Sequence, residues 1–309
     1  MNLHLSYPKG HSMSRSRTTR FTIAAITAAT ALTLAACGGN GSTDSPTTPA
    51  AGEASATEGG APVKLIVGAS PVPHAEILNF VKNEGLAEKA GFDLDIVEYT
   101  DYVQPNVALS EGDLDANYFQ HLPYLEAEIA DKGYEFSHFE GVHIEPYGIY
   151  SEKIKNISEL ADGAKVAISN DPSNQARALE LLVKEGALQK IDKDDVSIVD
   201  YYGNAEANPK KLEFVETEAP ALPRVLPDVD IAIINGNFAL EGGLKPSDDA
   251  IVLESVDGNP YANIVAYRTK EEGAKLDALK KLDEILHGDE VADFIKKTWP
   301  NGEVISSKN

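Results

Sequence analysis

The residues of this chain best suited to bind a small molecule lie in the stretch EGDLDANYFQHLPYL, residues 111–125. Asn117, Phe119, His121 and Tyr124 bring amide, imidazole and aromatic groups together, between an acidic turn and a helix that begins near Pro123. Such a cluster suits a small amphipathic ligand. It equally suits the end of a strand whose aromatic rings pack into the core, and the rest of the chain must decide between these two interpretations.

The sequence lacks the motifs of several common enzyme classes. There is no Walker A loop, no GxGxxG, no GxSxG elbow and no HExxH. The histidines that could hold a metal are scattered, and only His138 and His143 lie close together in sequence. We therefore expect no catalytic residue, no metal site and no cofactor.

The composition indicates a folded protein with an acidic surface. The 309 residues leave room for two domains, and 42% hydrophobic with 25% charged residues is ordinary for a globular chain. The formal net charge is -22, although the first 36 positions hold four basic residues and no acidic one. The remainder is therefore more acidic still. This argues against a nucleic-acid partner, because phosphate contacts require clustered Lys and Arg.

Residues 1–36 have the pattern of a lipoprotein signal peptide. Basic SRSRTTR leads into FTIAAITAATALTLAAC, a run too short and too rich in Ala and Thr to predict a spanning helix. Its end, LAAC, resembles a bacterial lipobox, which implies cleavage before Cys37 and attachment of lipid such as palmitate. The alternative is an ordinary secretory signal in which Cys37 is incidental. Either Met1 or Met13 can serve as the start, because the segment from Met13 is already a complete basic leader.

The segment after the lipobox is predicted to be a disordered tether. Residues 38–62, GGNGSTDSPTTPAAGEASATEGGAP, contain no aromatic residue and almost nothing that a core could bury. The lipidated Cys37 and this tether, residues 37–62, would separate the membrane from a fold that begins near Val63.

From residue 63 onward, apolar runs alternate with helical patterns, which predicts an α/β fold with parallel sheets. VKLIVGAS is typical of a strand covered on both faces, and a helix is expected over 74–89. The pattern restarts near 149, where GAKVAIS and VSIVDYY are predicted strands. We therefore predict two lobes, one from 63–148 and 257–309 and the other from 149–256.

Two such lobes bind ligand at the carboxyl ends of their strands, in the crevice between them. Polar residues sit just after several predicted strands. Residues 117–121 follow the short strand LDA, Tyr102 follows LDIVEY, Asn170 follows VAIS and Asn235 follows IAII. This placement favours the binding interpretation of the opening cluster.

Arg177 is the residue best suited to hold a carboxylate. Asp171 can cap the following helix and Pro172 occupies its first turn, so free backbone N–H groups lie close to Arg177. Asn174 lies one turn before Arg177, on a face pointing roughly away from the core. The alternative is a solvated Arg177 paired with Glu180 at i+3.

Asn235 and Asn263 are the two asparagines most deeply embedded in apolar sequence. Asn235 ends the run IAII, and Asn263 lies within YANIVAY. A buried amide needs hydrogen-bond partners, so each is satisfied either by the backbone or by a ligand. His121 beside Phe119 and Tyr124 could line a pocket for a polarizable side chain such as a thioether.

Taken together, five segments resemble the NlpA-type methionine-binding lipoproteins of ABC importers. They follow the lipobox in the order DYVQPNVALSEGDLDANYFQHLPYL, NDPSNQARALELL, NPKKLEFVETEAPALPR, IAIINGNFAL and NPYANIVAYR. The resemblance implies a type II-like periplasmic-binding-protein fold that closes on methionine between its lobes. It also implies delivery to a membrane permease driven by a separate ATPase, from an extracytoplasmic, lipid-anchored position, with no enzymatic activity.

Position by position, the resemblance implies roles for the candidate ligand-binding residues. The predicted set is Tyr102, Asn117, Phe119, His121, Tyr124, Asn174, Arg177, Asn235 and Asn263. The pocket for the sulfur falls on Tyr102, Phe119, His121 and Tyr124. The carboxylate partner falls on Arg177, and the clamp on the amino-acid head falls on Asn235 and Asn263, with Asn174 nearby.

This chain departs from the family pattern at two places. Gln175 and Ala176 stand where similar proteins often have a Gly before the Arg, and Glu145 stands where an aromatic residue is common. These differences leave open the choice between L- and D-methionine and the binding of methionyl peptides. The alternatives are a binding protein for another amino acid or a metal ion, and a secreted hydrolase or adhesive lipoprotein that has lost transport.

Overall fold

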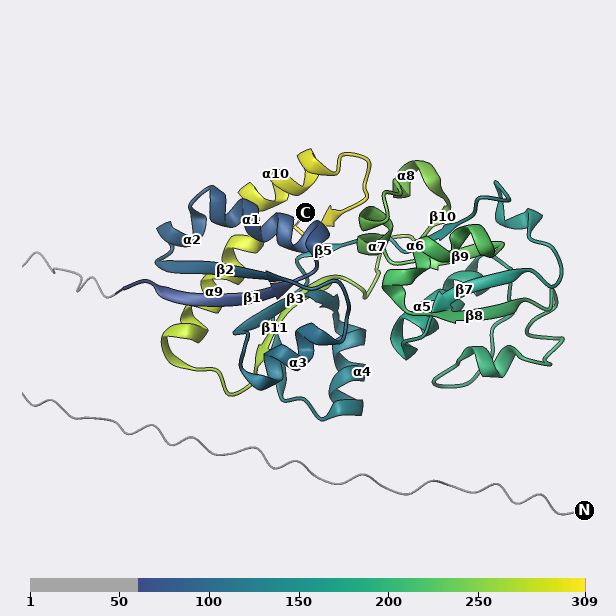
Figure 1. Cartoon of the computed structure of the whole chain (residues 1–309), viewed down its shortest axis with the longest axis horizontal. Coiled ribbons are helices and arrows are strands. Elements are labelled where there is room, and N and C mark those ends of the chain that lie inside the picture. The colour runs from purple at the N-terminus through teal and green to yellow at the C-terminus, as the bar shows by residue number, and fades with distance from the viewer. Residues whose placement is uncertain (1–60, 309) are drawn as a thin grey trace, which may run out of the picture. The chain divides into compact units, whose positions relative to one another are not determined.

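The computed structural model describes residues 61–308, in which the strands form two β-sheets that each carry helices (Figure 1). The predicted signal peptide 1–36, the lipidation site Cys37 and the predicted tether up to Gly60 lie outside the described residues. Among residues 61–308, every helix falls short of the length or the apolar character needed to cross a bilayer.

The first sheet has the strand order β12-β5-β11-β3-β1-β2, with β4 also paired to β11. Strand β1 runs parallel to β2 and β3, whereas β11 runs antiparallel to β3, β4 and β5. Within this sheet, the predicted parallel pairing is therefore confirmed for β1, β2 and β3. The strands are β1 (Val63–Ala69), β2 (Phe92–Glu98), β3 (Ala116–His121), β4 (Phe136–His138), β5 (His143–Ile144), β11 (Asn263–Arg268) and β12 (Ile305–Ser306).

Helices cover both faces of this sheet. Leu65 and Val67 of β1 pack in one cluster with residues of α1, α9 and α10, while Ile66 between them packs with residues of α3 and α4. Alternating side chains of a strand point to opposite faces, so β1 is buried on both sides, as predicted. The helices are α1 (Glu76–Asn83), α2 (Leu86–Lys89), α3 (Gln104–Glu111), α4 (Leu122–Lys132), α9 (Gly273–Leu286) and α10 (Asp289–Thr298).

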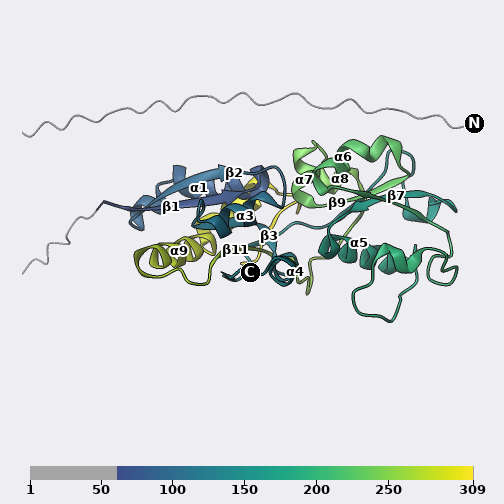
Figure 2. The ribbon, with the colours of Figure 1, turned by 60° about the horizontal axis from the view of Figure 1, so that its bottom comes forward.

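The second sheet has the strand order β10-β6-β9-β7-β8. Strand β7 runs parallel to β8 and β9, while β6 runs antiparallel to β9 and β10. Figure 2 shows α5 on one side of this sheet and α6, α7 and α8 on the other. The elements are β6 (Gly148–Tyr150), β7 (Lys165–Ser169), α5 (Pro172–Lys184), β8 (Glu213–Thr217), α6 (Leu222–Val225), β9 (Ile231–Ile234), α7 (Gly236–Glu241), α8 (Pro246–Asp249) and β10 (Ala250–Leu253).

The chain passes between the two sheets twice. It leaves the first sheet after Ile144 to enter β6, and it returns after Leu253 to enter β11. We call residues 145–147 the first passage and residues 254–262 the second passage. The predicted lobe boundaries, after residues 148 and 256, lie next to the first passage and inside the second, and they stay a prediction.

Three predicted elements differ from the structure. The segment VSIVDYY is a short 3-10 turn at Ile198–Tyr201, because the Asp200 carboxylate accepts the Ser197 backbone N–H at 3.0 Å in a capping box. The helix expected over 74–89 begins at Glu76 and breaks at Gly85, whose φ of 67° is left-handed. The cluster 117–121 belongs to strand β3 instead of following it.

A bulge in β3 determines where the cluster points. Gln120 pairs with Ile264 and Tyr118 pairs with Val265, so the register of β3 and β11 shifts and Phe119 has no partner across the ladder. A bulge re-aims side chains and is common beside functional sites. It explains how Phe119, Gln120 and His121, three consecutive strand residues, all line one cavity.

Truncation of a core residue of β1 should destabilise the described fold. Leu65 is fully buried in the cluster formed with α1 and α9. We expect Leu65→Ala to lower the free energy of unfolding by about 2–5 kcal/mol, because transfer and cavity terms add. Urea denaturation followed by circular dichroism measures this change. Val199→Ala is the control, since Val199 is 70% exposed, and an equal effect of both substitutions would contradict the assignment of this core.

Candidate ligand-binding site

One cavity collects side chains from elements of both sheets and from the first passage between them. It is lined by Tyr102, Phe119, Gln120, His121, Tyr124, Glu145, Asn174, Arg177, Asn235, Gly236 and Asn263.

The structure brings the predicted ligand-binding residues together with one exception. Asn117 is fully buried behind the cavity wall, where its side-chain amide donates to the Asn106 side chain at 2.8 Å and to the Pro105 backbone at 3.2 Å. Its hydrogen bonds are thus made within the protein, and Asn117 is absent from the lining.

Three lining residues were not predicted. Gln120 belongs to the cluster at 117–121, and Gly236 follows the predicted strand-end residue Asn235. The rule that site residues follow strands could therefore have identified both. The signal for Glu145 was weaker, because the sequence singled it out only as a departure from the family pattern.

The rings of Tyr102, Phe119 and Tyr124 form the apolar wall of the cavity. Their centroids lie 5.7–6.1 Å apart, within the range of favourable aromatic contacts. Both hydroxyl groups bond to the protein: Tyr102 donates to Asn237 Oδ1 at 2.6 Å, and Tyr124 donates to the Tyr102 carbonyl at 3.2 Å. With the hydroxyl groups satisfied, this wall offers ring surface to a ligand.

A chain of hydrogen bonds orients Asn174 and Asn235. His121 Nδ1 accepts the Tyr124 backbone N–H at 3.2 Å, so in the neutral ring Nε2 carries the proton and donates to Asn174 Oδ1 at 3.2 Å. Burial, followed by the charge of Arg177, lowers the pKa of His121 to about 3 and keeps the ring neutral. Asn174 Oδ1 also accepts Asn235 Nδ2 at 2.8 Å.

This chain of bonds leaves the side-chain oxygen of Asn235 without a partner. Asn235 is 5% exposed, and its Oδ1 is a buried acceptor that bonds to nothing in the described residues. A buried unsatisfied acceptor costs about 1–3 kcal/mol. Because Asn235 lines the cavity, a ligand donor is the natural partner for this oxygen.

Arg177 is buried, contrary to the expectation that its face of the helix points away from the core. Its partner is Glu254 of the second passage and not Glu180: Nε lies 3.2 Å from both carboxylate oxygens, and Nη2 lies 2.5 Å from Oε2. The guanidinium also lies over the rings of Tyr147 and Tyr261, 4.8 and 4.2 Å from their centroids.

Arg177 lines the cavity and keeps one nitrogen that its hydrogen bonds to the described residues do not use. Nε and Nη2 bond to Glu254, and Nη2 also donates to the Glu145 backbone carbonyl at 3.3 Å. The hydrogen bonds of the described residues do not use Nη1. A planar guanidinium with one edge fixed by a carboxylate can present this remaining nitrogen to a second carboxylate.

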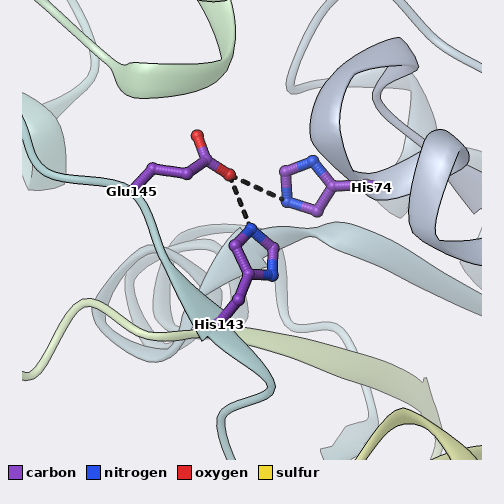
Figure 3. Close-up of side chains that lie close together, drawn as sticks. All are labelled: His74, His143 and Glu145. Atoms are coloured by element: carbon purple, nitrogen blue, oxygen red, sulfur yellow. Dashed lines mark hydrogen bonds and ion pairs between the residues drawn. The ribbon is translucent and has the colours of Figure 1, made fainter. Parts of the chain in front are cut away.

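Next to the cavity, His74, His143 and Glu145 form a buried group (Figure 3). The two imidazole Nε2 atoms lie 3.5 and 2.8 Å from Glu145 Oε1. The histidines were predicted to be too scattered for such a cluster, and the one pair considered, His138 and His143, does not form: His138 is exposed and bonds to the Phe139 carbonyl. His74, in the segment before α1, instead lies beside His143 of β5, with the two ring centroids 4.9 Å apart.

The chain is similar to known proteins in sequence. The sequence profile described as "NlpA lipoprotein" matches residues 65–307. The chain is 42% identical to the D-methionine-binding lipoprotein MetQ of Salmonella typhi, over 70% of this chain and 79% of that protein. It is 38% identical to the methionine-binding lipoprotein MetQ of Bacillus subtilis, over 76% of this chain and 85% of that protein.

Two solved structures are similar to the described fold. A lipoprotein of Actinomyces odontolyticus is 48% identical with a TM-score of 0.74, over 79% of this chain and 99% of that protein. A nutrient binding protein of Burkholderia cenocepacia, solved bound to methionine, is 41% identical with a TM-score of 0.72, over the same shares.

The buried His121 should make stability depend on pH. Its pKa of about 3 in the folded state lies below the ordinary value of 6.5, so the unfolded chain binds a proton that the folded chain does not. The contribution of His121 to the free energy of unfolding is therefore complete above pH 6.5, and it declines as the pH falls below 6.5. We expect the stability advantage of the wild type over His121→Gln to shrink by about 2 kcal/mol between pH 7 and pH 5.

Urea denaturation of both ligand-free proteins across this pH range measures the difference. Parallel stability profiles for the wild type and His121→Gln would show that His121 is not held neutral in the folded protein.

Proposed function

Because this chain belongs to the NlpA lipoprotein family, we propose that it is a lipid-anchored, extracytoplasmic solute-binding protein that captures methionine and delivers it to an ABC importer. The observation that carries the proposal is the composition of the cavity. An apolar aromatic wall faces a buried guanidinium and a buried amide oxygen that lacks a partner.

Membership of the family confirms several predictions from the sequence. The resemblance recognised in five segments is borne out by the profile match and by the named relatives. The likeness to the solved structures confirms the α/β, two-lobe periplasmic-binding-protein fold. The family is one of substrate-binding lipoproteins, so the chain is a binding protein and not an enzyme.

The polar end of the cavity fits the head of an α-amino acid. Arg177 Nη1 can donate to a carboxylate, and charge-assisted bonds of this kind are roughly twice as strong as neutral ones. Asn235 Oδ1 can accept from an ammonium group, which supplies the donor that the orphaned oxygen needs. These two contacts support an amino acid over a solute with only one charged group.

The apolar end of the cavity fits a thioether. Tyr102, Phe119 and Tyr124 offer ring edges and faces, and sulfur lies favourably about 5 Å from such rings. A charged side chain would lose its hydration there without gaining a partner. We therefore assign the side chain of methionine to this wall, with His121 at its edge beside Asn174.

Methionine binding is testable on the ligand-stripped soluble domain. Isothermal titration with L- and D-methionine should give saturable binding of at least one enantiomer, with a matching rise in melting temperature. Stripping under denaturing conditions and refolding come first, because a closed lobe pair can retain its solute during purification. No heat and no thermal shift with either enantiomer would refute methionine as the solute.

Substitutions at the polar end should weaken binding. Arg177→Ala and Asn235→Ala should each reduce methionine affinity at least tenfold, about 1.4 kcal/mol, because each removes a contact to the charged head. Arg224→Ala is the matched control, since Arg224 is exposed. Unchanged affinity in both cavity variants would mean that methionine binds elsewhere.

The anchor and the importer belong to the same proposal. The LAAC motif supports lipidation of Cys37, and two acyl chains give stable attachment where a single chain does not. We expect wild-type protein in the membrane fraction of its host and Cys37→Ala in the soluble or secreted fraction, as measured by fractionation and immunoblotting. Equal distribution of both proteins would contradict the lipid anchor.

A further inference from the structure

We propose that Glu145, braced by His74 and His143, binds the α-ammonium group of the solute and so restricts the site to solutes with a free, charged amino group. This inference rests on the proposed function, and it narrows the class of bound solutes to those with a free amino group.

The carboxylate of Glu145 is held in one orientation. Glu145 lies in the first passage and is 6% exposed. Both histidines approach the same oxygen, Oε1, and Figure 3 shows the other oxygen pointing away from them. A side chain built on Gly236 would come within 3.1 Å of that second oxygen, Oε2. Because Gly236 lines the cavity, Oε2 lies at the cavity wall.

His143 donates a hydrogen bond to the Glu145 carboxylate without neutralising its charge. His143 Nδ1 is hydrogen-bonded to the Tyr118 hydroxyl, and burial raises the pKa of Tyr118 well above its ordinary value. Tyr118 therefore keeps its proton and donates it to Nδ1, which places the proton of the neutral ring on Nε2, facing Glu145. Burial lowers the pKa of His143 to about 3, so the ring stays neutral.

The position of the proton on the His74 ring follows from its hydrogen-bond partners in the same way. Its Nε2 lies 3.0 Å from Asn263 Oδ1 and 3.5 Å from Glu145 Oε1, and both atoms are acceptors, so Nε2 must carry the proton. Burial lowers the pKa of His74 to about 4, so this ring is neutral as well. His74 is thus a neutral donor to the Asn263 side-chain oxygen, and its Nε2 lies beside the Glu145 carboxylate.

Within residues 61–308, the carboxylate lacks a cationic partner. The ion pairs of Glu145 join it only to the two neutral histidines, while the nearby guanidinium of Arg177 is paired with Glu254. Burial raises the pKa of Glu145, because an ionised carboxylate out of water is costly without a counter-charge. An ammonium group entering the cavity would supply that charge.

The neighbouring groups suit an ammonium group attached to an α-carbon. Asn235 precedes Gly236, and its orphaned Oδ1 gives a second acceptor beside Glu145. Arg177 Nη2 bonds to the backbone carbonyl of Glu145 at 3.3 Å, so the positive and negative poles of the site are adjacent. An α-amino acid carries its carboxylate and ammonium on one carbon and matches this spacing.

The same three side chains also resemble a metal-binding set, since their ligand atoms lie within 4.8 Å of one another. A metal ion would require the lone pairs of both Nε2 atoms, which carry protons in the arrangement above. It would also require His143 to move its proton to Nδ1 and Tyr118 to become an acceptor. The hydrogen bonds therefore favour the ammonium over a divalent cation.

The test compares two ligands and two proteins by calorimetry in buffer containing EDTA. The ligands are methionine and 4-(methylthio)butanoate, which lacks only the amino group. The proteins are the wild type and Glu145→Gln, which is nearly isosteric and lacks the charge. Glu218→Gln is the control, because Glu218 is exposed and directly follows β8 of the second sheet.

We expect the wild type to prefer methionine at least tenfold over the analogue. Glu145→Gln should lose at least tenfold in methionine affinity while its affinity for the analogue changes less than threefold, and Glu218→Gln should behave as the wild type. An equal loss for both ligands would reduce Glu145 to a structural role. If Glu145→Gln does not fold, wild-type protein that binds both ligands equally still overturns the inference.

Two further outcomes separate this inference from the proposed function. Wild-type protein that binds neither ligand refutes methionine as the solute, and this inference with it. Methionine binding that is lost in EDTA and restored by zinc identifies a metal site at His74, His143 and Glu145 and overturns the ammonium assignment alone.

Discussion

The buried ion pair between Arg177 and Glu254 is the constraint on which the site depends. Arg177 belongs to α5 on the second sheet, and Glu254 opens the second passage back to the first sheet. The guanidinium is stacked between Tyr147 and Tyr261, one from each passage. A buried charge that loses its partner costs about 3–5 kcal/mol, so this pair fixes both crossings relative to α5. Arg177 lines the cavity, and its remaining nitrogen, Nη1, is not used by the hydrogen bonds of the described residues.

The other polar groups of the cavity are oriented by hydrogen bonds. Each bond fixes which atom of the pair carries the proton. The Tyr124 backbone N–H fixes the tautomer of His121, His121 fixes the Asn174 amide, and Asn174 fixes Asn235. On the other side, Tyr118 fixes His143. Burial holds these imidazoles neutral, so they transmit orientation without adding charge. The site is thereby preorganised, and less of a ligand's interaction energy is lost in ordering side chains.

Much of this arrangement could be predicted from the sequence because it depends on local rules. Strand-end placement identified Tyr102, His121 and Asn235, and helix capping placed Asp171 and Asn174 at the start of α5, where Asp171 Oδ1 accepts the Asn174 backbone N–H at 2.8 Å. The resemblance of five segments to the NlpA-type lipoproteins predicted the periplasmic-binding-protein fold. What could not be predicted depends on contacts between distant segments. No spacing rule joins Arg177 to Glu254 or His74 to His143, and the bulge at Phe119 arises from the register of β3 against β11. The turn at 198–201 was missed because a Ser-x-x-Asp capping box outweighed an apolar, strand-like composition.

The central claim is that two charged poles and an aromatic wall select a zwitterionic thioether amino acid. The most direct test is mass spectrometry of the small molecule released when protein purified from its native host, without added ligand, is denatured. We expect methionine to be released in near-stoichiometric amount. Release of a different solute in that amount, such as a molecule without an α-amino group, would contradict it.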